Sequence, residues 1–440
     1  MIAMRTLHTI TARAALLATV TMVLLAPAMA GAQDGSLARR IAAVGDGEAR
    51  FSYPTRAGVC GDGRKVIGFG RLFSVHPDIE GWGRWSSAKC EPGPARVAVT
   101  VRGGEAVAMR PYVGGTWDVT TGVRDLGTVS GADAAAYLMD LAVAKDGIGK
   151  SALLPAAIAD APGTWERMLA IGRRTDLGLK TRRRAIDLAG ATGDASTVPS
   201  LVAIATAGEW DGKKRSSDDG VSAAAIGALA TIPGGAGTDA LLRLAKDSDA
   251  RVRKQTVFWL GQGDDVRGRR AARAMAEDTN EDVEVRAHAI FAIGMGDEST
   301  AEDRAWLRGL YPRLTSEKLR ERVLMSAGQQ GGPEDHRWLL ERAADTKETT
   351  HARRQAVFWA GQGGVPIADL VSLYGRLDDG QVKEHVIFAL SQRSETAATD
   401  ALLAMAQKDP DRAMRKKALF WLTQKDDPRV TKLITDMVSQ

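Results

Sequence analysis

A phrase of six residues recurs through the second half of this chain. Residues 257–262 read V-F-W-L-G-Q, and residues 357–362 read V-F-W-A-G-Q. Four looser copies are I-F-A-I-G-M at 290–295, L-M-S-A-G-Q at 324–329, I-F-A-L-S-Q at 387–392 and L-F-W-L-T-Q at 419–424. Successive copies start 33, 34, 33, 30 and 32 residues apart. This period is typical of a solenoid of helix pairs, in which each unit buries its apolar side only against its neighbours.

Each copy lies in a helix, called here a motif helix, that starts with a shared polar pattern. We number the first hydrophobic residue of each motif helix as position zero: Val252, Val285, Leu319, Ala352, Val382 and Met414. Three residues earlier stands a side chain that can accept a hydrogen bond from the helix N-terminus: Asp249, Asp282, Ser316, Thr349, Asp379 or Asp411. One residue after position zero stands a cation: Arg253, Arg286, Arg320, Arg353, Lys383 or Arg415.

This pattern, approximately D-x-x-V-R-x-x-A-x-x-A-L-G, resembles the second helix of HEAT repeats, in particular the short bacterial HEAT-like units. The resemblance covers roughly residues 149–440 and departs at Lys180 and Gly220, where the acid or the arginine is missing. It implies a mostly α fold and a ladder of charges between successive units. The matching positions for the ladder are Asp249, Arg253, Asp282, Arg286, Arg320, Arg353, Asp379, Lys383, Asp411 and Arg415.

Two earlier helices align with the repeat, at Lys180 and Gly220, and are separated by a polar insertion at 209–219. A degenerate first unit begins near Gly149. The helical region as a whole starts at Ser130, where Ser130 and Asp133 have the spacing of a capping box. We therefore expect an α-solenoid of about nine units over residues 130–440.

Residues 1–32 have the pattern of a cleaved secretory signal peptide: Arg5 and Arg13, an apolar run over 14–25, then small residues. No later segment offers the roughly 20 apolar residues of a membrane span. We expect an exported chain, periplasmic or secreted. The chain has 59 basic and 54 acidic residues, and loss of the leader removes two arginines and no acid, which leaves a net charge of +3. Nearly neutral, interspersed charge disfavours nucleic acid as a partner.

Residues 33–129 predict a small β-rich module with one short helix over 36–44. Residues 98–113 alternate across Gly103-Gly104, which is a hairpin pattern. In an exported protein the two cysteines, Cys60 and Cys90, most simply form one disulfide. Its loop of about thirty residues corresponds to roughly 3 to 4 kcal/mol in the loop-entropy model. Reduced or metal-bound cysteines are the weaker alternatives, since zinc needs four ligands.

Helical phase places positions 0, 4, 5 and 8 of each motif helix on one apolar face, and positions 2, 3, 6 and 10 on another. Position 6 is large and apolar in every copy, and this apolar stripe consists of Phe258, Phe291, Met325, Phe358, Phe388 and Phe420. Glutamines accompany it at position 10: Gln262, Gln329, Gln362, Gln392 and Gln424. An exposed stripe of this kind on a concave face predicts a docking surface for a peptide or protein. The alternative is that tight curvature buries the rings as a second core.

Other conspicuous residues have structural explanations. At position 7, Trp259, Trp359 and Trp421 alternate with small residues, which predicts interdigitation between units. His288 and His385 share position 3 but lie too far apart in the array to share a metal, so we expect solvated histidines and no metal or cofactor.

Evidence for catalysis is thin. His76 and Asp78, beside Trp82 and Trp85, form the one cluster in the β module with a base near an acid, without an activated nucleophile or a metal-ligand spacing. We expect a non-enzymatic scaffold that binds protein or peptide in the cell envelope. Two alternatives stay open: an envelope enzyme or enzyme accessory, such as a lyase-like HEAT protein, with its site in the β module, and a purely structural spacer.

Overall fold

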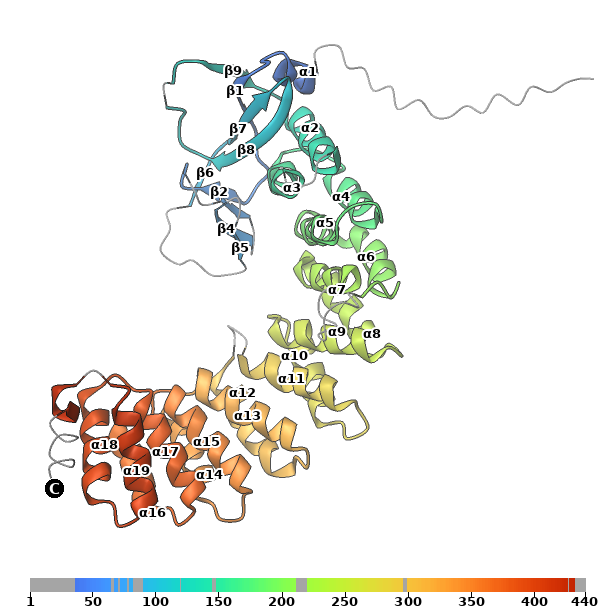
Figure 1. Ribbon diagram of the computed structural model, residues 1–440. Coiled ribbons are helices and arrows are strands. Elements are labelled where there is room, and N and C mark those ends of the chain that lie inside the picture. Colours follow the sequence, from blue (N-terminus) through green and yellow to red (C-terminus); the bar gives the residue numbers. More distant parts are fainter. Residues whose placement is uncertain are drawn as a thin grey trace, which may run out of the picture.

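The computed structural model describes residues 36–64, 67–69, 72–76, 79–81, 90–118, 120–144, 148–210, 220–295, 299–425 and 427–431. The predicted leader at 1–32 and most of the predicted insertion at 209–219 lie outside these residues. The described chain is mostly helical, with a small β-rich module near its N-terminal end (Figure 1). This is the predicted fold class.

The β module begins with the short helix α1 (Leu37–Ala42), which Ser36 caps, and contains two sheets. The four-stranded sheet has the order β8-β7-β1-β9 and comprises β1 (Gly47–Tyr53), β7 (Ala95–Arg102), β8 (Glu105–Val113) and β9 (Val123–Thr128). The antiparallel five-stranded sheet has the order β5-β4-β3-β2-β6 and comprises β2 (Val59–Gly61), β3 (Ile67–Phe69), β4 (Leu72–His76), β5 (Ile79–Gly81) and β6 (Glu91–Pro92).

Two local predictions for the module are confirmed. β7 and β8 form a hairpin in which Arg102 pairs with Glu105, and Gly103 and Gly104 between them have φ values of 57° and 78°. Two consecutive positive φ angles match the right-handed twist of a hairpin, and glycine adopts them without a Cβ clash. Cys60 and Cys90 form a disulfide with Cα atoms 5.1 Å apart, which ties β2 to the residue before β6.

Helices α2 to α19 of the described residues form nine consecutive pairs. The first helices are α2 (Gly131–Ala144), α4 (Thr164–Arg173), α6 (Val198–Ala205), α8 (Ala236–Leu244), α10 (Val266–Glu277), α12 (Ala301–Leu310), α14 (Pro333–Ala344), α16 (Ile367–Arg376) and α18 (Thr396–Lys408). The second helices are α3 (Gly149–Ile158), α5 (Leu179–Thr192), α7 (Val221–Thr231), α9 (Ala250–Gln262), α11 (Val283–Met295), α13 (Glu317–Gln330), α15 (Thr350–Gln362), α17 (Gly380–Ser391) and α19 (Arg412–Leu422).

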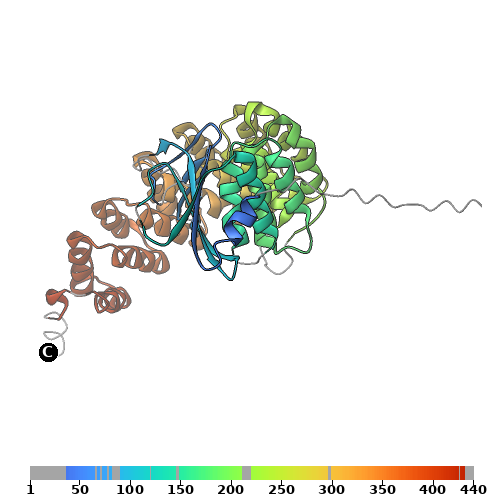
Figure 2. The same ribbon diagram turned by 90° about the horizontal axis from the view of Figure 1, so that it is seen from above.

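The second helices pack against one another from α3 to α19, whereas the first helices contact each other much less. Helices on the inside of a curved array lie closer together than those on the outside, so we assign the second helices to the inner face. In the N-terminal units α3, α5 and α7 lie on the side of the β module, and α4, α6 and α8 lie on the far side (Figure 1). Seen from above, the C-terminal units extend to one side of the N-terminal ones, so the array also winds out of one plane (Figure 2).

The glycine of the repeated phrase, at position 9, sets this close spacing. A Cβ on Gly261 would lie 2.7 Å from the Cβ of Ala292, and a Cβ on Gly361 would lie 2.8 Å from that of Ala389. At Gly328 the nearest atoms are the Cβ and the carbonyl oxygen of Trp359, both at 2.7 Å. In each case position 9 of one unit meets position 7 of the next, and any side chain would push the helices apart.

The β module packs on the first units of the solenoid. The hydroxyl of Tyr53 in β1 donates to the carbonyl oxygen of Pro155 in α3, at 2.8 Å. The ring of Phe51 meets Tyr137 of α2 edge to face, with centroids 6.2 Å apart. Arg56 donates from Nη1 to the carbonyl of Thr192 at the end of α5, at 3.2 Å. The module thus packs against the first two helix pairs of the array.

Candidate interaction surface

The helix caps lie where the repeat predicts them. In five motif helices the side chain three residues before position zero accepts a hydrogen bond from a backbone N–H of the first turn. These are Asp249 with Arg251, Asp282 with Glu284, Thr349 with Ala352, Asp379 with Gln381 and Asp411 with Ala413. Ser316, the sixth, makes no side-chain cap bond.

The arginine after position zero mainly ties the two helices of its own unit together. In five units it donates to a carbonyl at or just beyond the C-terminal end of the preceding first helix, where carbonyls lack helical partners. The pairs are Arg253 with Asp247 and Ser248, Arg286 with Ala276, Arg320 with Leu314, Arg353 with Ala343, and Arg415 with Asp409 and Pro410.

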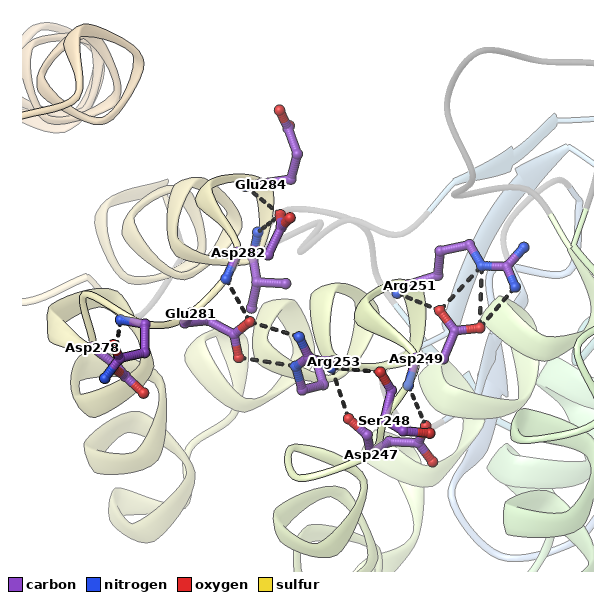
Figure 3. Close-up of polar contacts among 11 residues, drawn as sticks. Asp247, Ser248, Asp249, Arg251, Arg253, Asp278, Glu281, Asp282 and Glu284 are labelled. Carbon is purple, nitrogen blue, oxygen red and sulfur yellow. Dashed lines mark hydrogen bonds and ion pairs between the residues drawn. The ribbon is translucent and has the colours of Figure 1, made fainter.

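The ladder between units exists, but its acids are mostly not the predicted ones. Arg353 reaches the predicted acid, Asp379 of the next unit, at 3.7 Å. Arg253 instead pairs with Glu281, one residue before the cap Asp282, at 2.8 Å (Figure 3). Arg320 likewise pairs with Glu348, one residue before the cap Thr349, at 3.0 Å.

The capping carboxylates also have partners within their own helices, although Asp379 both caps α17 and receives Arg353. Asp282 faces the N–H groups of α11, and Asp249 also binds the side chain of Arg251 (Figure 3). Lys383 departs further, because its ammonium lies over the ring of Tyr374 at 5.3 Å.

A second set of ion pairs between units, formed by the first helices, was not predicted. The carboxylate of Asp303, only 1% exposed, receives Arg269 at 3.0 Å and Arg273 at 2.6 Å from the preceding unit. Burial alone would raise the pKa of Asp303, but hydrogen bonds from Arg273 and Thr300 and the charge of Arg269 outweigh it and hold the pKa below its usual value. The spacing of Thr300 and Asp303 is that of a capping box, so the sequence carried this signal.

The apolar stripe forms a second layer above the core. Positions 0, 4, 5 and 8 of α9 are buried, as the helical phase requires. The stripe residues on α9 to α17 are half-buried, and Phe420 is 56% exposed. The described hydrophobic core includes the tryptophans of position 7 as packed neighbours, whereas the stripe residues lie outside it. The rings are therefore neither free in solvent nor part of the main core.

The rings contact one another in parts of the stripe. Phe258 and Phe291, on neighbouring motif helices, stack with centroids 6.3 Å apart. Phe388 meets Trp421 of the next unit at 5.1 Å, and Phe420 meets the same indole at 5.2 Å.

The tryptophans at position 7 do not pack as predicted, against the small position-7 residues of neighbouring units. Trp259 covers Gly227, which is position 6 of the preceding unit, and Trp421 covers Phe388 in the same relation. These rings therefore lean along the stripe, toward the preceding position 6.

The glutamines differ among themselves. Gln262 donates from Nε2 to the carbonyl of Ala292 in the next unit, at 3.2 Å, so its amide links two units. Gln392 and Gln424 donate to neighbouring hydroxyls of their own segments, at 3.1 and 3.4 Å, and both are exposed. Gln329 and Gln362 are also exposed. Four of the five predicted amides thus face solvent beside the stripe.

The histidines at position 3 are half-buried, not freely solvated as predicted. His385 accepts a hydrogen bond from Nε of Arg354, 3.2 Å away on the preceding motif helix. Burial, followed by the charge of Arg354, lowers the pKa of His385. At neutral pH the imidazole is therefore uncharged and extends the polar surface that borders the stripe.

The alternative site predicted in the β module lies mostly outside the described residues. Asp78, Trp82 and Trp85 lie outside the described residues, and so does the side chain of His76. Among the described residues no group of three or more His, Cys, Asp or Glu side chains could hold a metal ion. Within that same part of the chain, no single helix could cross a membrane; 221–231 and 233–244 reach the needed apolar length only together, with a bend of 109°.

Comparisons with known proteins give distant structural similarity only. No family model and no curated protein matches the chain. Matching solved structures include the AP-3 complex, at 14% identity over 70% of this chain and 57% of that one, with a TM-score of 0.38. The CpcE–CpcF phycocyanin lyase from Nostoc sp. PCC7120 matches at 18% identity over 56% of this chain and 95% of that one, with a TM-score of 0.26. Kap95p bound to RanGDP matches at 13% identity over 68% and 45%, with a TM-score of 0.33.

Proposed function

We propose that this chain is a HEAT-type, non-enzymatic scaffold of the cell envelope that binds a segment of a partner protein along its apolar stripe. The observation that carries the proposal is the repetition of one large apolar side chain at position 6 of six successive motif helices, outside the core, half-buried in five of them and exposed in the sixth. A side chain needed only for packing would lie among the buried positions 0, 4, 5 and 8. Six equivalent side chains on the inner face instead form an extended apolar surface, which is typical of a protein-binding site.

The stripe has the dimensions of a peptide-binding groove. Neighbouring packed helices lie about 8 to 10 Å apart, so six of them carry the stripe over roughly 40 to 50 Å. An extended segment of about 12 to 15 residues, at ~3.3 Å per residue, spans that length. The exposed glutamines beside the rings offer donors and acceptors for its backbone.

Site-specific photo-crosslinking tests this proposal. A benzophenone amino acid replaces Phe358 in one protein and Phe388 in another, and each is exposed to an envelope extract. We expect the same partner band from both positions, competed away by unlabelled chain and not by the Phe291→Ser/Phe420→Ser variant. The control carries the probe at Val371, which is 38% exposed on the first helix α16. A band from Val371 and none from the stripe would contradict the proposal.

A further inference from the structure

The apolar stripe has a charged border on one side only. Positions 2 and 3 of each motif helix lie three to four residues before position 6, so their side chains flank the stripe on the helix surface. In the six motif helices these positions hold Lys254, Gln255, Ala287, His288, Glu321, Arg322, Arg354, Gln355, Glu384, His385, Lys416 and Lys417. This basic row contains five cations and two carboxylates. The opposite border, at position 10, carries five glutamines and one methionine and is neutral.

Contacts join the basic row to the stripe and from unit to unit. Nη1 of Arg322 lies 3.8 Å from the sulfur of Met325. The ring of His385 lies 6.4 Å from that of Phe388. Arg354 bonds across units to His385, and Lys417 pairs across units with Glu384 at 2.6 Å. The row is therefore linked from unit to unit over α15 to α19, and it contacts the stripe at Met325 and Phe388.

Three cations of the row have no anionic partner in the described part of the chain. Arg322, Arg354 and Lys416 form no ion pair there. Nearby arginines behave differently: Arg320, two residues before Arg322, is ion-paired to Glu348. Arg354 instead faces a histidine whose pKa it lowers. The border of the stripe thus carries positive charge that the fold leaves unbalanced.

We propose that the surface takes an acidic amphipathic segment of a partner protein, whose apolar side chains lie on the stripe and whose carboxylates lie on the basic row. This inference rests on the scaffold function proposed above and adds the chemistry of the partner. Carboxylates would give Arg322 and Arg354 charge-assisted hydrogen bonds that the fold does not supply. A basic segment would meet like charge at Arg322, Arg354 and Lys416. The row also contains the carboxylates of Glu321 and Glu384. They would repel the regularly spaced charges of a phosphate backbone, whereas the separate carboxylates of a peptide can lie beside the cations alone.

A peptide selection tests the chemistry of the partner directly. A display library of random 15-residue peptides is selected on the full chain and counter-selected on the Phe358→Ser/Phe388→Ser variant. We expect survivors rich in Asp and Glu together with Leu, Ile and Phe. Survivors with neutral or basic composition would overturn the acidic partner and leave the scaffold function standing. An absence of peptides that distinguish the two proteins would overturn both.

Binding measurements on the strongest peptide then locate the charge effect. Fluorescence anisotropy should show at least about tenfold weaker binding to Arg322→Gln/Arg354→Gln, and a steep loss of affinity with added salt. The matched control, Arg337→Gln/Arg376→Gln, removes two exposed arginines from the first helices α14 and α16 and should change affinity less than about twofold. Equal effects of the two pairs, or displacement of the peptide by a single-stranded oligonucleotide at lower concentration, would overturn the proposal.

Discussion

Helices α7 and α15 occupy the same place in their units, yet their inner faces differ. Every residue of α7 from Val221 to Leu229 is buried, and its position 6 is Gly227. In α15 the corresponding residue is Phe358, which is half-buried and lies outside the core. The inner face is therefore closed by packing in the early units and open in the later ones, although one repeat builds both.

One contact and the place of the β module explain the closed part. The ring of Trp259, from the next motif helix, lies over Gly227, where a Cβ would be 3.0 Å from it. The same indole and Phe69 of the β module line a cavity of about 490 Å³ that the end of α7 also borders. With Arg56 bonded to the end of α5, the module occupies the inner side of the first units. The stripe begins at Phe258 of α9, next to this indole.

The largest expected effect comes from placing a stripe residue in the closed region. Gly227→Phe should lower the free energy of unfolding by about 3 kcal/mol, because the new ring must displace the indole of Trp259. Thermal and urea unfolding of the full chain measure the change. The control is Gly309→Phe in α12, where a Cβ would meet nothing within 4 Å. Equal stability of the two variants would mean that Trp259 does not close the inner face.

Two arginines of the motif helices allow an ion-paired charge to be compared with a charge that has no ion pair. Arg320→Gln should cost about 2 kcal/mol, because Glu348, with a side chain only 6% exposed, loses a guanidinium partner. Arg354→Gln should cost less than about 0.5 kcal/mol, because no ion pair is broken. Parallel urea titrations measure both. A large cost at Arg354 would show that its charge serves the fold and would remove it from the binding surface.

A glycine beneath the stripe tests whether the open face reflects loose packing. Gly328→Ala should cost about 1 to 2 kcal/mol, since the new methyl would meet backbone atoms of Trp359 at 2.7 to 3.0 Å. Gly375→Ala, in α16 with nothing within 4 Å, should instead stabilise by about 0.5 to 1 kcal/mol through helix propensity. Differential scanning calorimetry resolves the two signs. If both variants gained stability, the helices under the stripe would be less tightly packed than the structure shows.

The sequence predicts the repetitive part of this molecule well. The fixed period defines the helix pairs, and caps such as Asp249 and Asp379 follow from local rules because their partners lie two or three residues away. The charge ladder is correct in kind and is displaced by one residue at Glu281, beside the cap Asp282, whereas Asp379 serves as both cap and ladder acid. The close approach of neighbouring motif helices at position 9 also has a local signal, since glycine stands there in four of the six copies.

Long-range features could not be predicted in the same way. No local pattern shows that Phe69 of the β module comes near Trp259, nearly two hundred residues later in the chain. The partial burial of the stripe has the same origin: the stacking of Phe258 on Phe291 depends on the angle between neighbouring units. Periodicity identified which side chains share a face, and only the superhelix determines how far apart they lie.

The smallest expected change of stability concerns the stripe itself. Phe358→Ala should cost about 1 kcal/mol, because the half-buried ring lies outside the core and its removal leaves no closed cavity. Leu390→Ala, at a fully buried position of α17, removes fewer atoms and should cost about 3 kcal/mol. Chemical denaturation of both variants gives the comparison. A cost at Phe358 equal to or above that at Leu390 would place the ring in the core, and the stripe would then be a part of the packing that no partner needs to cover.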